Sequence, residues 1–273
     1  MTPTAKSLIL ELLVAAGGVP LAVRQLVRAA ALFEISQNNV RVAIVRLAGS
    51  GLIEAAGRGA YRLAPSAEDL AREVASWAKA EERVKTWSGG YWAVFTGALG
   101  RTDRAALRRR ARALSIAGFG ELERGLHLRP DNLRGGIEAV RDRLHALGLE
   151  TEAPVFAASS FDPGFEARLQ RLWDGKALSS GYQRARLELE RWLEGAGELD
   201  PDVAARESFL LGGRAIRRIV YDPLLPPPFV DVAERRAFIE TMKVMDREGR
   251  RIWRRFFAVS DAEPAPGAEA RVH

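Results

Sequence analysis

Residues 1–65 carry apolar side chains at helical spacing in three stretches, which glycine, proline and serine separate. This pattern predicts three short helices, over residues 7–15, 21–31 and 36–48. Pro20 suits the first position of the second helix, because its missing N–H has no intrahelical acceptor there. Ser36 suits the N-cap of the third helix.

Two short apolar segments then lie on either side of Gly57-Arg58-Gly59. Glycines at such a turn predict a β-hairpin, here with an arginine at its tip. Three helices followed by a hairpin are the element order of a winged helix-turn-helix. We therefore predict a DNA-binding domain of this kind over residues 1–65.

The third helix is expected to bury Val40, Ala43, Ile44 and Leu47 on one face. Its other side presents amide, guanidinium and valine groups, which pair with adenine or guanine edges and with the thymine methyl group in the major groove. A cation at the hairpin tip suits DNA phosphates or the minor groove. The predicted DNA-contacting residues are Gln37, Asn38, Asn39, Arg41, Val45, Arg46 and Arg58.

The rest of the chain separates into a mixed part and a helical part. A linking helix is predicted over residues 66–86, followed by the order βαββαβ over residues 87–161, which indicates a ferredoxin-like domain. Its expected elements are a strand over 91–96, a helix over 101–115 that Asp103 caps, two strands within 119–128, a helix over 132–147 and a strand over 155–159. A helical C-terminal domain over residues 162–260 contains helices predicted at 165–172, 180–193, 201–221 and 231–257. A disordered tail, 261–273, ends the chain, and the predicted fold class is α+β, mostly α.

Composition narrows the functional classes. The chain has 273 residues, 47% of them hydrophobic and 28% charged, and a formal net charge of +6. The segment 1–65 holds seven basic and three acidic side chains, a net charge of +4, so most of the excess lies in the predicted DNA-binding domain. The absence of cysteine excludes disulfide scaffolds, cysteine-ligated metal sites and thiol nucleophiles. No apolar run approaches a membrane span and the N-terminus does not resemble a signal peptide, so we expect a cytoplasmic protein without a membrane partner.

Five stretches, in the same order along the chain, resemble the PaaX-like repressors of phenylacetic acid catabolism. They are Asn39–Leu47, Gly57–Tyr61, Trp87–Trp92, Ala117–Leu122 and the most specific one, Arg217–Pro226, which reads Arg-Arg-Ile-Val-Tyr-Asp-Pro-Leu-Leu-Pro. The resemblance implies a homodimeric repressor of an aromatic-acid catabolic operon that binds roughly palindromic double-stranded operator DNA. It also implies release by an effector, phenylacetyl-CoA or another acyl-CoA or aromatic acid, and no cofactor.

An effector pocket would be concave and largely apolar, with a few convergent polar groups. The candidate effector-binding residues are Trp92, Arg104, Arg108 and Arg217. Arginines are densest between Arg101 and Arg112, and three interpretations of this run stay open: a solvated helix face, a second DNA-backbone contact, or a cradle for coenzyme A phosphates. We expect Asp222, before Pro223, to pair with a nearby arginine that fixes the bend.

The enzymatic alternative is a metal-dependent nuclease, because the middle domain resembles the small ferredoxin-like subunits of CRISPR adaptation. Metal-dependent members of that fold place an aspartate at the end of the first strand, where this chain has Thr96. A neutral hydroxyl is a poor substitute for an anionic Mg²⁺ ligand, and we interpret His127 and His145 as structural. We predict no catalytic or metal site. A single-strand-binding adaptor would need exposed stacking aromatics, and residues 1–65 offer only Phe33 and Tyr61.

Overall fold

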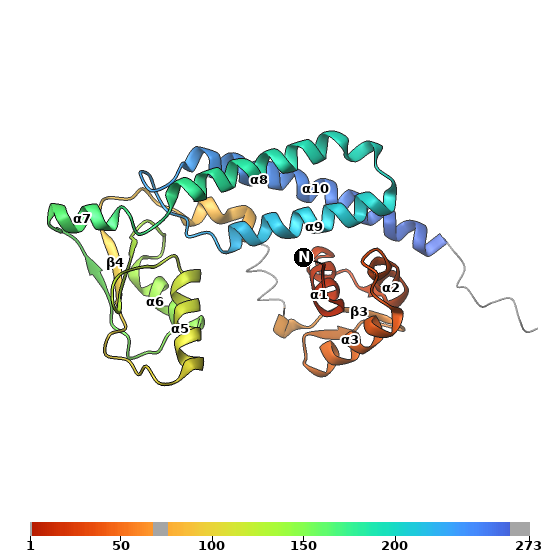
Figure 1. The fold of residues 1–273 in the computed structure, drawn as a ribbon. Coiled ribbons are helices and arrows are strands. Elements are labelled where there is room, and N and C mark those ends of the chain that lie inside the picture. The colour runs from red at the N-terminus through yellow and green to blue at the C-terminus, as the bar shows by residue number, and fades with distance from the viewer. Residues whose placement is uncertain (1, 68–75, 263–273) are drawn as a thin grey trace, which may run out of the picture. The chain divides into compact units, whose positions relative to one another are not determined.

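The computed structural model describes residues 2–67 and 76–262 (Figure 1). The fold is α+β, mostly helical, with two small antiparallel sheets. The chain divides into two compact units: the first comprises residues 1–77, 188–216 and 241–273, and the second comprises residues 78–187 and 217–240. In the described ranges, none of the helices has the length and apolar character that a membrane crossing requires.

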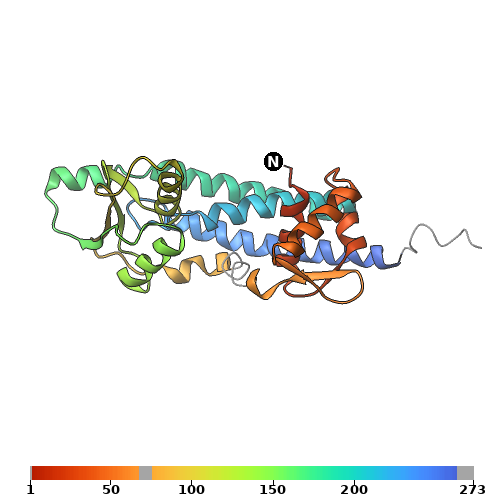
Figure 2. The ribbon, with the colours of Figure 1, turned by 90° about the horizontal axis from the view of Figure 1, so that it is seen from below.

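The first unit begins with a three-helix arrangement and a hairpin. Its N-terminal elements are α1 (Ala5–Ala15), β1 (Leu21–Ala22), α2 (Val23–Ala31), α3 (Gln37–Gly49), β2 (Ile53–Ala55) and β3 (Ala60–Leu63). The strands form one antiparallel sheet in the order β1-β3-β2, and Figure 2 shows the hairpin of β2 and β3 beside the helices. The three helices and the hairpin occur where the apolar spacing predicts them.

One core joins these elements to the later helices of the same unit. Leu8, Leu26 and Leu47, one from each of α1, α2 and α3, are fully buried in it. Ala205 and Phe256 complete the buried cluster from α9 (Pro201–Val220) and α10 (Val232–Ala262). Parts of the C-terminal helices therefore stabilise the N-terminal segment through burial of apolar surface.

The second helix starts later than its sequence pattern predicts. Leu21 and Ala22 pair with Tyr61 and Ala60 of β3 as a short strand, and α2 begins at Val23. The prediction that Pro20 occupies the first helical position is therefore wrong. Pairing with a strand that is distant in the sequence overrides a local helical preference because it satisfies the same backbone groups.

The second unit contains a four-stranded antiparallel sheet with two helices between its strands. Along the chain its elements are β4 (Tyr91–Phe95), α5 (Arg104–Ile116), β5 (Gly120–Glu123), β6 (Leu126–Pro130), α6 (Gly136–Ala146) and β7 (Val155–Ala158). The strand order in the sheet is β5-β6-β4-β7. In the central strand, Ala93 lies opposite Leu128 of β6 on one side and Phe156 of β7 on the other. The order of strands and helices along the chain is the predicted βαββαβ.

The remaining elements are helical. They are η1 (Ser76–Arg83), α7 (Pro163–Leu169), α8 (Gly175–Gly195), η2 (Ala196–Glu198), α9 and α10. Asp200 accepts hydrogen bonds from the backbone N–H groups of residues 202 and 203 and so caps the start of α9. The last helix continues to Ala262, beyond its predicted end at residue 257. The predicted tail lies outside the described residues from 263 onward.

Two predicted helices differ from the structure. Of the linking helix predicted over 66–86, residues 66–67 are helical and residues 76–83 form the 3-10 helix η1 with a kink at Lys79. Residues 68–75 lie outside the described part. After η1, the backbone N–H of Lys85 donates to the carbonyl of Asn132 (2.8 Å), so the chain is extended there. The helix predicted from 132 begins only at Gly136, because Gly135 and Gly136 have positive φ angles of 86° and 69°.

Candidate nucleic-acid interface

Helix α3 is held in one orientation by its cap and its buried face. The Ser36 hydroxyl accepts a hydrogen bond from the Asn39 backbone N–H (3.3 Å), which confirms the predicted N-cap. The four side chains predicted to face the core, Val40, Ala43, Ile44 and Leu47, are all buried. The opposite side of the helix is therefore fixed outward.

The outward side carries all the predicted contacts of this helix. Gln37, Asn38, Asn39, Arg41, Val45 and Arg46 are all exposed. Val45 is 71% exposed and Val42, beside it, is 40% exposed, which is unusual for valine on a helix of a packed domain. Amide, guanidinium and methyl groups are thus presented together on one helix surface, as base-edge recognition requires.

The hairpin tip presents Arg58 to solvent between two glycines. Gly57 and Gly59 have φ angles of 99° and 71°, a conformation that side chains rarely adopt, so the turn depends on glycine. The Gly59 carbonyl accepts a hydrogen bond from the Val23 N–H (2.9 Å), which attaches the turn to the start of α2. Arg58 is exposed at this anchored tip.

The arginines of this surface differ in whether their side chains have ion-pair or hydrogen-bond partners. Arg62 on β3 forms an ion pair with Glu54 on β2 (2.7 Å). Within the described residues, Arg41, Arg46 and Arg58 have no ion-pair or hydrogen-bond partner for their side chains. These three arginines therefore carry charge that is available to phosphates or guanine edges.

The four candidate effector residues come from three elements. Arg104 and Arg108 are exposed on α5, and Arg217 is exposed on α9. Trp92 is 4% exposed on β4, with the Arg129 guanidinium 5.9 Å from the centre of its ring. None of the four lines either pocket described below. The structure does not bring them together, and their role in binding an effector stays a prediction.

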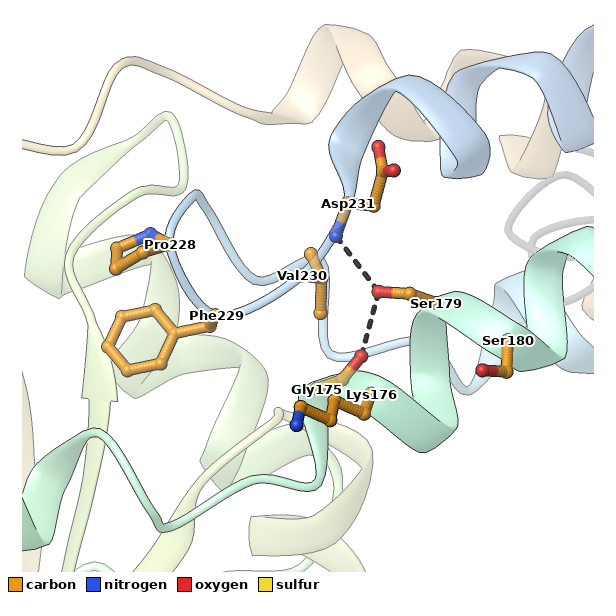
Figure 3. A pocket seen from close by; sticks show the side chains of 8 residues that line it. All are labelled: Gly175, Lys176, Ser179, Ser180, Pro228, Phe229, Val230 and Asp231. Atoms are coloured by element: carbon orange, nitrogen blue, oxygen red, sulfur yellow. Dashed lines mark hydrogen bonds between the residues drawn. The ribbon is translucent and has the colours of Figure 1, made fainter.

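An open pocket of about 370 Å³ lies in the second unit beside the start of α8 (Figure 3). The Ser179 hydroxyl in its wall donates to the Gly175 carbonyl (2.7 Å) and accepts from the Asp231 N–H (2.9 Å). Among the described residues that line it, Lys176 is the one cation. Both hydrogen bonds of the Ser179 hydroxyl are made within the protein, so it is not available to a ligand. We therefore interpret this pocket as the packing site of the start of α8 against residues 228–231.

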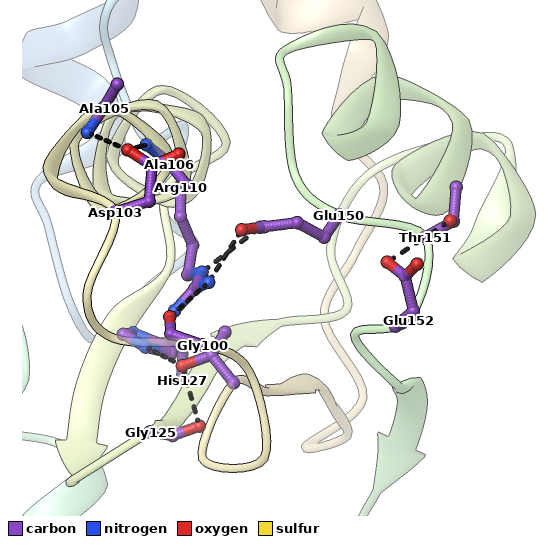
Figure 4. A network of polar contacts seen from close by, with 11 residues as sticks. Gly100, Asp103, Ala105, Ala106, Arg110, Gly125, His127, Glu150, Thr151 and Glu152 are labelled. Carbon is purple, nitrogen blue, oxygen red and sulfur yellow. Dashed lines mark hydrogen bonds and ion pairs between the residues drawn. The ribbon is translucent and has the colours of Figure 1, made fainter.

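A polar network lies near the end of β4, where the enzymatic alternative expects an aspartate and this chain has Thr96 (Figure 4). Thr96 is 5% exposed, and its hydroxyl lies 3.4 Å from the Gly125 carbonyl and 3.3 Å from His127 Nε2. Burial lowers the pKa of His127, although Glu121 at 4.0 Å opposes this effect. In the part of the chain that the structure describes, no three carboxylate or imidazole side chains are grouped as metal ligands.

Part of the dense arginine run is structural. Arg110 is 6% exposed and forms a two-point ion pair with Glu150, at 2.7 and 3.1 Å, and it also donates to the Gly100 carbonyl (Figure 4). This pairing lowers the pKa of the Glu150 carboxyl. Asp103 accepts from the N–H groups of residues 105 and 106, as the predicted cap of α5. Arg101, Arg104, Arg108, Arg109 and Arg112 are exposed, so the three interpretations of the run stay open for them.

The predicted partner of Asp222 is wrong. Its Oδ2 accepts a hydrogen bond from the Tyr182 hydroxyl (2.6 Å), and its Oδ1 accepts one from the Leu224 N–H (2.7 Å). Burial raises the pKa of Asp222 above that of a solvated carboxyl, and the Tyr182 hydrogen bond opposes this shift. The side chain that bonds Asp222 is thus a tyrosine of the earlier helix α8, although the charge of the buried Arg235 also acts on this carboxyl.

Three polar side chains that sequence reasoning missed hold the next carbonyl groups. Arg129 donates to the carbonyl of residue 223 (3.3 Å), Asn132 to that of residue 224 (2.6 Å) and Arg235 to that of residue 225 (2.7 Å). All three are almost fully buried. In the sequence these three residues are only polar positions near apolar ones. Neither their burial nor the carbonyl groups that they bond can be identified from that pattern.

Comparison with known proteins agrees with this architecture. The family model described as PaaX-like protein matches residues 4–67, and the one described as PaaX-like protein C-terminal domain matches residues 173–255. A solved structure, the uncharacterized protein Rv0674 from Mycobacterium tuberculosis, is similar with a TM-score of 0.62 and 23% identity, over 92% of this chain and 99% of that one. At this identity the likeness concerns the fold alone. Comparison with curated proteins finds no match. Because the two family models together cover both the N-terminal helices with their hairpin and the C-terminal helices, this chain belongs to the PaaX-like family.

Proposed function

We propose that this protein is a DNA-binding transcriptional regulator whose N-terminal segment works as a winged helix-turn-helix. The observation that carries the proposal is the outer side of α3, where exposed amides, unpaired arginines and exposed valines lie on a helix whose other face is locked in a core. In this proposal α3 enters the major groove and Arg58 contacts the backbone at the edge of the site. The PaaX-like match over residues 4–67 supports it.

The finer proposal is a homodimeric repressor of an aromatic-acid catabolic operon of the phenylacetate type. Family membership supports this role. The middle segment would be ferredoxin-like, which the strand order β5-β6-β4-β7 supports. An effector such as phenylacetyl-CoA would release the protein from its operator. A hundredfold loss of operator affinity requires about 2.7 kcal/mol of coupling between effector and DNA.

A titration of the duplex upstream of the protein's own gene tests the proposal. Fluorescence anisotropy at about 0.15 M salt should show specific binding that an unrelated duplex does not reproduce. Replacement of Arg58 by alanine should weaken binding to both duplexes and reduce the slope of log affinity against log salt by about one. Arg191→Ala, an exposed arginine on α8, is the matched control and should change neither.

The same experiment separates the alternatives. Equal affinity for the upstream and the unrelated duplex would contradict a regulatory role. Tighter binding to single strands than to duplex would favour the adaptor interpretation. Addition of phenylacetyl-CoA and of other acyl-CoA compounds to the preformed complex then tests the effector class, because an effector must lower the affinity for the upstream duplex.

A further inference from the structure

A second, enclosed pocket lies in the second unit where the end of α9 and the Asp222–Leu224 segment meet α5, β6 and α6. Arg83, Arg129 and Arg143 line it, and most of its remaining wall is apolar, with Val140 among the side chains. Its open space is about 10 Å³, room for about one water molecule. Three arginines around so small a space are unusual, because like charges repel at short range.

Arg129 is the most deeply buried of these three arginines. It is 2% exposed, and its guanidinium donates only to neutral oxygens: the carbonyls of residues 117, 130 and 223 and the Asn132 side chain. In the part of the chain that the structure describes, no carboxylate pairs with it. Burial, followed by the charges of Arg83 and Arg143, lowers the pKa of Arg129 to about 9. A buried, uncompensated charge is costly, and an entering anion would remove that cost.

Among the described residues that line the pocket, Asp222 is the one carboxylate, and it is already engaged. Both of its oxygens accept hydrogen bonds, from the Tyr182 hydroxyl and from the Leu224 N–H. Burial raises its pKa, and the Tyr182 hydrogen bond and the charge of the buried Arg235 oppose this shift. Asp222 therefore uses both oxygens in the fold of the 222–225 segment, and neither oxygen accepts a hydrogen bond from Arg129.

We propose that this pocket binds the oxyanion group of a small molecule, a carboxylate or a phosphate. Arg129 uses four of its five N–H groups within the protein, which leaves one N–H and the positive charge for the ligand. Arg83 and Arg143 complete a cationic ring around the oxyanion. The apolar wall receives the carbon atoms next to it, and the small space requires the lining side chains to move apart as the ligand enters.

The position of the pocket suits a regulatory ligand. Val220, the last residue of α9, lines it, and Arg129 holds the carbonyl of residue 223 just beyond. The earlier turns of the same helix contribute Phe209 and Leu210 to the core of the N-terminal helices. An oxyanion at Arg129 would therefore act on the end of a helix whose start supports the DNA-binding surface. This regulatory step rests on the proposed function; the binding site itself does not.

Isothermal titration of the full chain without DNA tests the site. The probes are phenylacetate as a carboxylate, inorganic phosphate and coenzyme A as phosphates, and phenylacetamide as a neutral analogue of the first. We expect saturable binding of at least one oxyanion and none of the amide. Arg129→Gln removes bonds to three carbonyls and endangers the fold, so Arg83→Gln and Arg143→Gln are the informative variants.

Each of these two variants should weaken oxyanion binding by about tenfold or more. Arg171→Gln, an exposed arginine of the same unit, should leave it unchanged. Binding of phenylacetate but not of phosphate would identify the carboxylate as the group recognised, and the reverse result would identify the phosphate. The proposal is overturned if no oxyanion binds, if the amide binds equally well, or if both variants bind like the unmodified protein. Because no DNA is present, failure of the regulator proposal leaves this result unaffected.

Discussion

Replacing Arg41 by alanine should separate DNA recognition from folding. Arg41 is exposed on the outer side of α3, and among the described residues its side chain has no partner. Its removal should therefore change the free energy of unfolding by no more than about 0.5 kcal/mol. A guanidinium that reads one guanine edge contributes about 1 to 3 kcal/mol, so affinity for the cognate duplex should fall about 5- to 150-fold.

Leu47→Ala, on the inner side of the same helix, is the opposite case. Leu47 is fully buried, and shortening it should lower the free energy of unfolding by about 2 to 5 kcal/mol. Urea denaturation measures this loss for both variants. Below the unfolding transition, the folded fraction of Leu47→Ala should keep the base preference of the unmodified protein.

The measurement for Arg41 is fluorescence anisotropy against the upstream duplex, together with selection of preferred sites from a randomised duplex library. The selected sites of Arg41→Ala should lose discrimination at one base pair in each half-site. An unchanged base preference would refute the assignment of Arg41 to a base edge. An equal loss of affinity for every sequence would instead place Arg41 on the phosphate backbone.

Two further predictions concern stability. Arg110→Gln should destabilise the protein by about 2 to 4 kcal/mol at pH 7, because it leaves Glu150 without its partner in a half-buried place. The pKa of Glu150 is lowered in the folded state, so the ion pair stabilises the protein above the unfolded pKa near 4.5, and this stability is lost as the pH falls through the folded pKa. The loss of unfolding free energy caused by Arg110→Gln, measured by urea denaturation, should therefore be smaller at pH 3 than at pH 7. The control Arg112→Gln should show no loss at either pH. Gly175→Ala would place a Cβ 1.6 Å from a backbone carbonyl oxygen and should lower the melting temperature, at a cost of about 1 to 3 kcal/mol or more. Gly212→Ala, within α9 and with no atom within 4 Å of the added Cβ, should raise the melting temperature slightly; a loss equal to that of Gly175→Ala would contradict the steric argument.

Short-range chemistry made the N-terminal quarter predictable. The Ser36 cap, the four core positions of α3 and the glycines around Arg58 act within one or two turns of the chain. Apolar periodicity identifies which side of a helix must be buried, so the exposed side follows by exclusion. The candidate DNA-contacting residues are exposed on α3 and the hairpin for this reason, although their contacts with DNA stay a prediction.

Long-range pairing decided what the pattern could not. Leu21 and Ala22 became a strand because β3, which follows all three N-terminal helices in the chain, supplies their partners. The helix predicted from Asn132 began only at Gly136 because the backbone before it pairs with a distant segment: the Asn132 carbonyl accepts from the Lys85 N–H, and the Arg134 N–H donates to the Arg83 carbonyl. In both places a distant segment satisfied polar backbone groups that the local pattern assigned to a helix.

The pocket of Arg83, Arg129 and Arg143 shows the same limit at a candidate site. The three residues are unremarkable arginines in an arginine-rich sequence, and nothing in their spacing along the chain indicates that they converge. The sequence by itself determined the helices, the hairpin, the family resemblance and the outward side of α3, since each depends on neighbouring residues. Only the tertiary structure decided that Arg62 pairs with Glu54, that Arg110 pairs with Glu150, and that the buried Arg129 pairs with no carboxylate of the described residues. Burial and charge partners arise only when distant segments pack together.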